Sequence, residues 1–159
     1  MNPSLPEAYS IVEALAPQTM GAIATGDYVS LKNVNMAYIV AHLTQGNAAV
    51  QDIKPLQATA VAGTSAKALS NAVPIWSNLD CAAGGTMTRR TDGTTYSTDA
   101  AVKHKVVVFQ IDPSSLDVAN SFDVLGVELA ASNAANLLGV TYVLDQRYKA
   151  DPPPTTITD

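Results

Sequence analysis

The residue types that most often catalyse reactions or bind metals are scarce in this sequence. It contains two histidines, His42 and His104, and one cysteine, Cys81, and these three are not spaced as metal ligands are. A serine hydrolase would need an activated nucleophile, but no Gly-x-Ser-x-Gly motif occurs, and Ser114 and Ser132 lie in turn-like contexts where serine is common. We therefore predict no catalytic residue, no metal site, no cofactor and no enzymatic activity. A small hydrolase is the least favoured alternative.

Three carboxylates, Asp112, Asp117 and Asp123, lie close together in the sequence. Paired carboxylates can bind calcium or hydrolyse glycosides. However, Asp112 precedes Pro113 as the cap of a turn does, and no EF-hand loop is present, so structural roles are favoured. The glycine-rich residues 83–86 are not followed by Gly-Lys-Ser/Thr, which excludes a phosphate-binding loop of that kind.

Aromatic side chains could form a sugar-binding groove, but their spacing favours the core or an interface. Most of them occur once or twice in each expected strand, namely Tyr28, Tyr38, Trp76, Tyr96, Tyr142 and Tyr148. A carbohydrate-binding β-sandwich module is therefore kept as an alternative.

The composition shows an unusual shortage of charge. Of the 159 residues, 47% are hydrophobic but only 14% are charged, against about 25% in an average globular domain. The net charge of -5 argues against binding to nucleic acid, and no apolar run is long enough to span a membrane. A neutral surface is typical of protein–protein interfaces, which are depleted in charge at their centre.

Hydrophobic alternation predicts mainly strands. We expect them over residues 33–44, 50–61, 73–79, 103–111, 122–130 and 138–148, and a hairpin over 87–96 around Asp92-Gly93. Both faces of the 33–44 strand are apolar, which suits a strand packed on two sides or lying at an interface. Pro55 suggests an edge strand or a bulge, and Gly126 suggests another bulge.

These elements predict an antiparallel β-sandwich or a jelly-roll-like barrel. Residues 1–18 are expected to form an N-terminal arm or short helix, with helical spacing over 7–15, and 19–150 to form the β-domain. Residues 151–159 contain three consecutive prolines and are expected to form an extended arm.

Several segments of the sequence are similar to segments of a known family of proteins. They are Lys105–Asp117 (KVVVFQIDPSSLD), Phe122–Ser132 (FDVLGVELAAS) and Val140–Tyr148 (VTYVLDQRY), together with Gln57–Leu69 (QATAVAGTSAKAL) and Ile75-Trp76. This pattern resembles small virion structural proteins of tailed bacteriophages. The resemblance implies a decoration or minor capsid protein without an enzymatic site.

We therefore expect a decoration subunit that binds the outer surface of an assembled capsid and stabilises neighbouring capsomers. Its partners would be the major capsid protein and copies of itself, without nucleic acid or membrane, in a virion assembled in the host cytoplasm. The expected contact residues are Leu5, Tyr9, Arg89, Arg90, Pro152, Pro153, Pro154 and Ile157. A tail or head–tail connector subunit is the main alternative.

Overall fold

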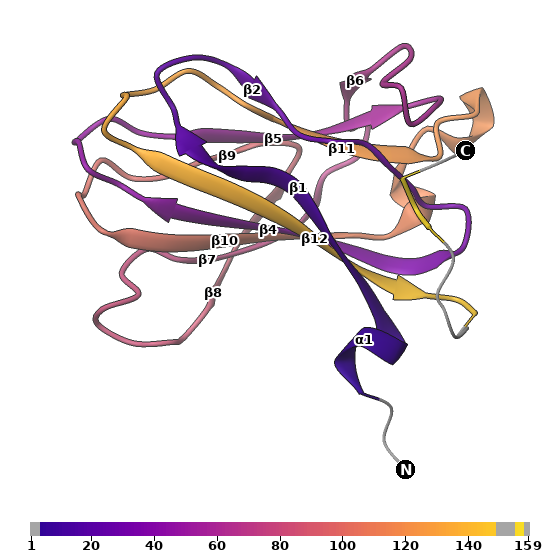
Figure 1. Cartoon of the computed structure of the whole chain (residues 1–159), viewed down its shortest axis with the longest axis horizontal. Helices are drawn as coiled ribbons and strands as arrows, with labels where there is room; N and C mark the ends of the chain where they lie inside the picture. Colours follow the sequence, from indigo (N-terminus) through magenta and orange to yellow (C-terminus); the bar gives the residue numbers. More distant parts are fainter. Residues whose placement is uncertain (1–3, 149–154, 158–159) are drawn as a thin grey trace.

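Two antiparallel sheets pack face to face in the computed structural model, which describes residues 4–148 and 155–157 (Figure 1). Sheet A has the order β1 (Tyr9–Thr19), β12 (Leu137–Gln146), β4 (Val34–Thr44), β10 (His104–Ile111), β7 (Val73–Asn78) and β8 (Thr88–Gly93). Sheet B has the order β2 (Ala24–Thr25), β11 (Val124–Leu129), β5 (Asp52–Ala58) and β6 (Lys67–Ala68), while β3 (Val29–Ser30) pairs with β11 and β9 (Tyr96–Ser97) with β5. The prediction of a mainly β antiparallel sandwich is confirmed.

The core lies between the sheets because alternate side chains of each strand point inward. In β10, Val107, Phe109 and Ile111 are fully buried, and β4 buries Ile39 and Leu43 from the same sheet. The helical residues are α1 (Leu5–Ala8), η1 (Pro113–Ser115) and η2 (Val118–Asn120), which lie outside the sheets. The strand predicted over 103–111 is therefore confirmed as a central strand of sheet A.

Of the arm or short helix expected for residues 1–18, a short helix is present, but it does not follow the helical spacing of residues 7–15. Only Leu5–Ala8 is helical, and from Tyr9 the chain runs as β1, which pairs with β12 along the edge of sheet A. Ala14 is buried on the inner side of β1, whereas Ile11 and Glu13 on the outer side are exposed. A long-range strand partner therefore overrides the local helical spacing, and the β-domain includes residues 9–18 that were assigned to the arm.

The hairpin expected around Asp92-Gly93 does not form. Both residues lie within β8, which pairs with β7 in sheet A, whereas β9 follows and pairs with β5 in sheet B. The chain crosses from one sheet to the other after Gly93. The turn signal fails because the two arms have other partners: β8 pairs with the preceding strand β7, and β9 pairs with β5 of the other sheet.

Pro55 does not mark an edge strand, because β5 has neighbours on both sides. It pairs with β11 along its length, while on the other side β9 pairs with Asp52 and Ile53 and β6 pairs with Leu56 and Gln57. Between these two short partners, Pro55 has no strand opposite it. A residue without a backbone N–H is tolerated at this gap in the ladder.

Gly126 does not form a bulge, because the pairing of β11 with β5 continues in register across it. The glycine is required for another reason. A Cβ atom at this position would overlap the ring of Tyr28, which packs against the strand. The glycine at position 126 is therefore explained by the close approach of Tyr28 to β11. It is not explained by a break in the pairing of β11 with β5.

Candidate interaction surface

The residues considered for catalysis and metal binding do not form a site. His42 points outward from β4, and the ring Nδ1 of His104 lies 3.2 Å from the hydroxyl of Thr44. Cys81 is half-buried, and its backbone N–H donates to the carbonyl of His104. Within residues 4–148 and 155–157, no three His, Cys, Asp or Glu side chains gather as metal ligands do.

The three neighbouring carboxylates have separate structural partners. Asp112 accepts hydrogen bonds from the hydroxyl and backbone N–H of Ser114, which lower the pKa of its carboxyl group and confirm its capping role. Asp117 lies 2.5 Å from the ammonium group of Lys67, which also lowers its pKa. The side chain of Asp123 pairs with Lys32 instead.

The outer face of sheet A is unusual because it is almost free of charged side chains. We define it as the outward side chains of β12, β4, β10 and β7. They are Leu137, Gly139, Thr141, Val143, Asp145, Met36, Tyr38, Val40, His42, Thr44, His104, Val106, Val108, Gln110, Pro74, Trp76 and Asn78. Asp145 is the only Asp, Glu, Lys or Arg among them.

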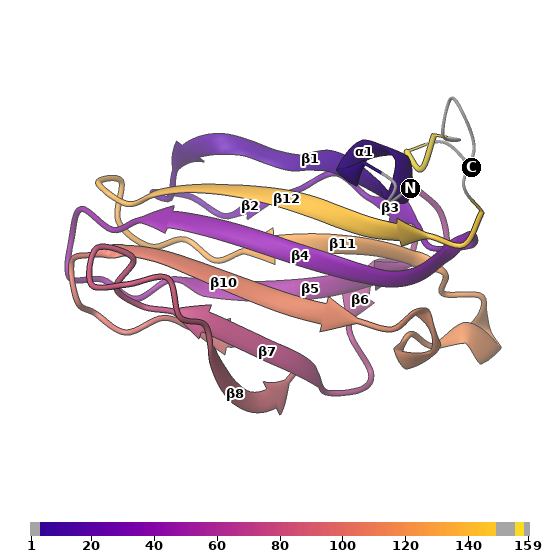
Figure 2. The same ribbon diagram turned by 90° about the horizontal axis from the view of Figure 1, so that it is seen from below.

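Strand register aligns these side chains in rows across the sheet. One row crosses all six strands, because successive Cα partners are Glu13, Thr141, Val40, Val108, Trp76 and Arg89. Directly opposed residues of antiparallel strands share one face. Figure 2 looks onto this face, and no described helix or loop crosses the centre of β4 and β10. The middle of the row is therefore apolar and uncovered.

Charged groups lie only at the two ends of this row. Glu13 is exposed on edge strand β1. On the opposite edge, the guanidinium group of Arg89 lies 5.6 Å from the centre of the Trp76 ring and 2.6 Å from Asp92. A neutral centre with charged edges is the usual layout of a protein interface.

A groove of about 440 Å³ hollows the outer face between β1 and β4. It forms where the pairing of β1 with β12 shifts register at Leu15 and Gln18. Thr141 and His42 line it, and Pro17 covers the backbone of Gly139, whose missing side chain leaves the room for this contact.

The structure places the expected contact residues on different parts of the molecule. Tyr9 and Arg89 lie at opposite edges of sheet A, next to the outer face. Arg90 instead donates from Nε to the hydroxyl of Ser77, 2.7 Å away. Leu5 is exposed on α1, and Ile157 is exposed beside Thr156.

The carbonyl of Thr156 accepts a hydrogen bond from the backbone N–H of Ser30 in β3, so the C-terminal segment returns to its own domain here. Pro152, Pro153 and Pro154 lie outside the described residues. The central residues of the outer face were not among the expected contact residues. A signal for them was present in the sequence, because Met36, Tyr38 and Val40 give β4 apolar side chains on its second face as well as on its core face.

The aromatic side chains do not gather into one surface. Tyr142 is fully buried, with its hydroxyl donating to the carbonyl of Asp27 at 2.8 Å, and burial raises its pKa. Tyr96 lies 3.1 Å from the Ser77 hydroxyl, and Tyr28 packs against Gly126. Trp76 and Tyr38 both lie on the outer face, on strands separated by β10.

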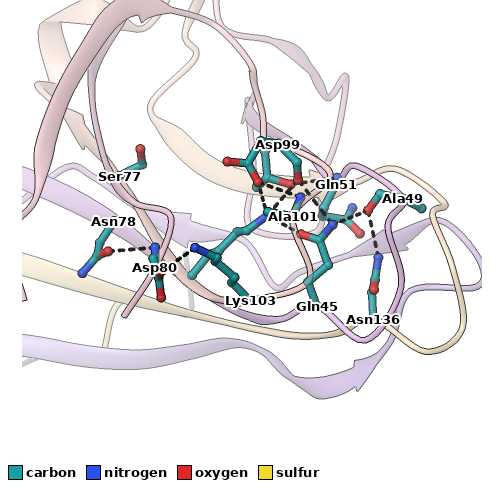
Figure 3. A network of polar contacts seen from close by, with 12 residues as sticks. Gln45, Ala49, Gln51, Ser77, Asn78, Asp80, Asp99, Ala101, Lys103 and Asn136 are labelled. Carbon is teal, nitrogen blue, oxygen red and sulfur yellow. Dashed lines mark hydrogen bonds and ion pairs between the residues drawn. The ribbon is translucent and has the colours of Figure 1, made fainter. Parts of the chain in front are cut away.

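A polar network closes the end of the sandwich at which β4 ends and β10 and β12 begin (Figure 3). The buried ammonium group of Lys105 donates to Gln45 Oε1 at 2.6 Å and to Asp99 Oδ1 at 2.6 Å. Gln45 in turn donates to the carbonyl of Ala49, which also accepts from Asn136. These bonds fix three loops relative to one another.

Asp99 is expected to make the stability of the fold sensitive to acid. The hydrogen bond from Lys105 lowers the pKa of its carboxyl group, although partial burial opposes this. The ionised Asp99 carboxylate therefore contributes fully to the free energy of unfolding above its unfolded-state pKa of about 3.9. This contribution is lost as the pH falls toward the lower folded-state pKa. We expect Asp99→Asn to lose less stability than the wild type between pH 6 and pH 3 in urea unfolding. Equal losses would contradict this role.

Comparisons with known proteins identify the fold. No family model and no curated protein matches the chain. The structure of the SPBc2 prophage-derived protein YomS aligns with a TM-score of 0.51 at 9% identity, covering 86% of this chain and 91% of YomS. A CBM4 structure aligns with a TM-score of 0.32 at 10% identity, covering 89% of this chain and 85% of the other. The likeness to YomS shows a shared β-sandwich fold.

No helix among the described residues is long and apolar enough to cross a membrane.

Proposed function

We propose that this chain is a non-enzymatic structural protein of a phage particle that decorates the outside of the assembled capsid. In this role the outer face of sheet A is buried against a neighbouring protein subunit, and the decoration stabilises adjacent capsomers. The partners are the major capsid protein and copies of this chain.

One observation carries the proposal: the outer face is almost uncharged across β12, β4, β10 and β7, with Asp145 as its only Asp, Glu, Lys or Arg, and its centre at Val40 and Val108 is apolar. Its central side chains Val40, Val108 and Trp76 are partly exposed, and contiguous apolar surface open to solvent marks sites of association. Val40 and Val108 are directly paired at its centre, where side chains of an interface are usually desolvated.

A phage particle is supported by two further observations. The segments from Lys105 to Asp117 and from Phe122 to Ser132 resemble virion structural proteins of tailed phages. The fold is similar to that of a prophage-derived protein. A shell offers many equivalent positions, so repeated weak contacts add up to stable attachment.

Val108→Lys tests whether the outer face is needed for attachment. The substitution places an ammonium group at the centre of the face, and desolvating it on binding is expected to weaken attachment at least about tenfold. The measurement is co-sedimentation of the purified protein with undecorated heads of the phage whose genome encodes it.

Val118→Lys is the matched control. It makes the same change at an exposed valine of η2, outside sheet A, and is expected to bind as the wild type does. Circular dichroism and thermal unfolding check that both variants are folded. The proposal fails if the wild type does not co-sediment, or if folded Val108→Lys binds normally.

A further inference from the structure

We infer that the subunit covering the outer face is a second copy of this chain, related by a two-fold axis that runs along the strands between two facing sheets. The inference rests on the proposed function only in taking the outer face as a protein interface. It adds the partner and the geometry: the decorating unit is a dimer with sheet A packed on sheet A.

The strand order determines what such an axis brings together. In sheet A, β1 and β8 are the two edges and β4 and β10 are the centre (Figure 2). An axis along the strands places β1 of one copy over β8 of the other, β12 over β7, and β4 over β10. An axis across the strands would instead place each strand over its own copy. Facing sheets pack about 10 Å apart, a distance that side chains from both sides fill.

Charge favours the axis along the strands. Glu13 and Arg89 end the same row at opposite edges of the sheet. With β1 over β8, Glu13 of each copy faces Arg89 of the other, which gives two ion pairs at the rim. With the axis across the strands, Glu13 would face Glu13 and Arg89 would face Arg89. Like charges opposed at an interface are unfavourable.

Shape favours the same axis. The partly exposed indole of Trp76 lies on the outer face of β7, in the row that contains Thr141 of β12. Because the axis places β7 over β12, Trp76 of one copy meets the groove that Thr141 and His42 line on the other. An aromatic side chain that enters a pocket is a common anchor of interfaces. The groove and Trp76 are therefore complementary features of one surface.

The area is sufficient for a stable dimer. Six strands at a spacing of about 4.8 Å and about six residues along each give a face of roughly 600 Å² per copy. Two copies would bury about 1,200 Å² in total, which exceeds the roughly 1,000 Å² of a specific interface. At the centre, the valines Val40 and Val108 of one copy would lie over Val108 and Val40 of the other.

The mass of the purified full chain in solution tests the dimer. Sedimentation velocity at concentrations from about 1 to 100 µM, a range over which dimers of this size form, is expected to show twice the mass of the chain. Folded Val108→Lys is expected to be a monomer, and Val118→Lys a dimer. A wild type that stays monomeric throughout this range overturns the inference.

Charge exchange tests the axis. Glu13→Arg and Arg89→Glu are each expected to weaken the dimer roughly tenfold, because either one turns two opposite-charge contacts into repulsive ones. The double variant, which exchanges the two charges, is expected to recover the wild-type affinity. Failure of the double variant to recover would overturn this axis, since the alternative axis never brings Glu13 and Arg89 together.

The two proposals fail separately. A monomer that still binds heads, and loses binding with Val108→Lys, overturns the dimer and leaves the decoration function standing. A charge-dependent dimer that binds no heads supports the dimer and overturns the decoration function.

Discussion

Lys105→Ala is expected to lower the free energy of unfolding by about 3 kcal/mol, because it opens a cavity and removes a donor from buried acceptors. The side chain is fully buried, and its ammonium group donates to Gln45 Oε1 and to both the carbonyl and the carboxylate of Asp99. Without it, Gln45 Oε1 loses a partner inside the sandwich. Urea unfolding followed by tryptophan fluorescence measures the change.

Two further substitutions separate the effect of the cavity from the effect of the lost ammonium group. Lys105→Met keeps the apolar stem and removes only the ammonium group, so it is expected to cost less than Lys105→Ala. Lys32→Ala removes a lysine that is mostly exposed and 3.8 Å from Asp123, and is expected to cost under about 0.5 kcal/mol. If Lys105→Ala is no more destabilising than Lys32→Ala, the network does not hold the loops together.

Gly126→Ala is expected to destabilise the fold by about 1–3 kcal/mol, the usual cost of overpacking. A methyl group there would overlap one edge of the Tyr28 ring. The opposite edge of the ring lies beside Gly63, where a Cβ atom would come within 2.8 Å of it, so Tyr28 packs against two glycines. Thermal unfolding should therefore show a lower melting temperature.

Gly84→Ala is the matched control for this substitution. No atom lies within 4 Å of a Cβ placed at Gly84, and its φ is not positive. The same chemical change is therefore expected to be nearly neutral. Equal melting temperatures for both variants would show that the contact with Tyr28 is not tight.

The class of fold could be predicted from local patterns, but the partner of each strand could not. Residues 33–44 and 103–111 are rich in apolar, β-branched and aromatic side chains, so both were expected as strands. Tyr9–Thr19 was mistaken because its structure depends on β12, which is distant in the sequence, and the Asp92-Gly93 turn was mistaken because β8 pairs with the preceding strand β7 while β9 pairs with β5 of the other sheet. Local propensity is weaker than long-range pairing of this kind.

The chemistry of the buried network could have been anticipated from spacing. Lys105 has the same parity in its strand as Val107 and Phe109, so it had to share their inward face. What spacing could not provide was the partners of its ammonium group. Gln45 and Asp99 come from loops 60 and 6 residues away, and only the closure of the sandwich brings them together.

The amino-acid sequence by itself determined that the chain is built of strands, that it lacks the usual catalytic patterns, and that several strands are apolar on both faces. It could not determine which of those faces forms the core. A period of two shows which side chains share a face, but not what covers that face. The tertiary structure decided this by packing sheet B on one side of β4 and β10 and leaving Val40, Val108 and Trp76 on the other side partly exposed.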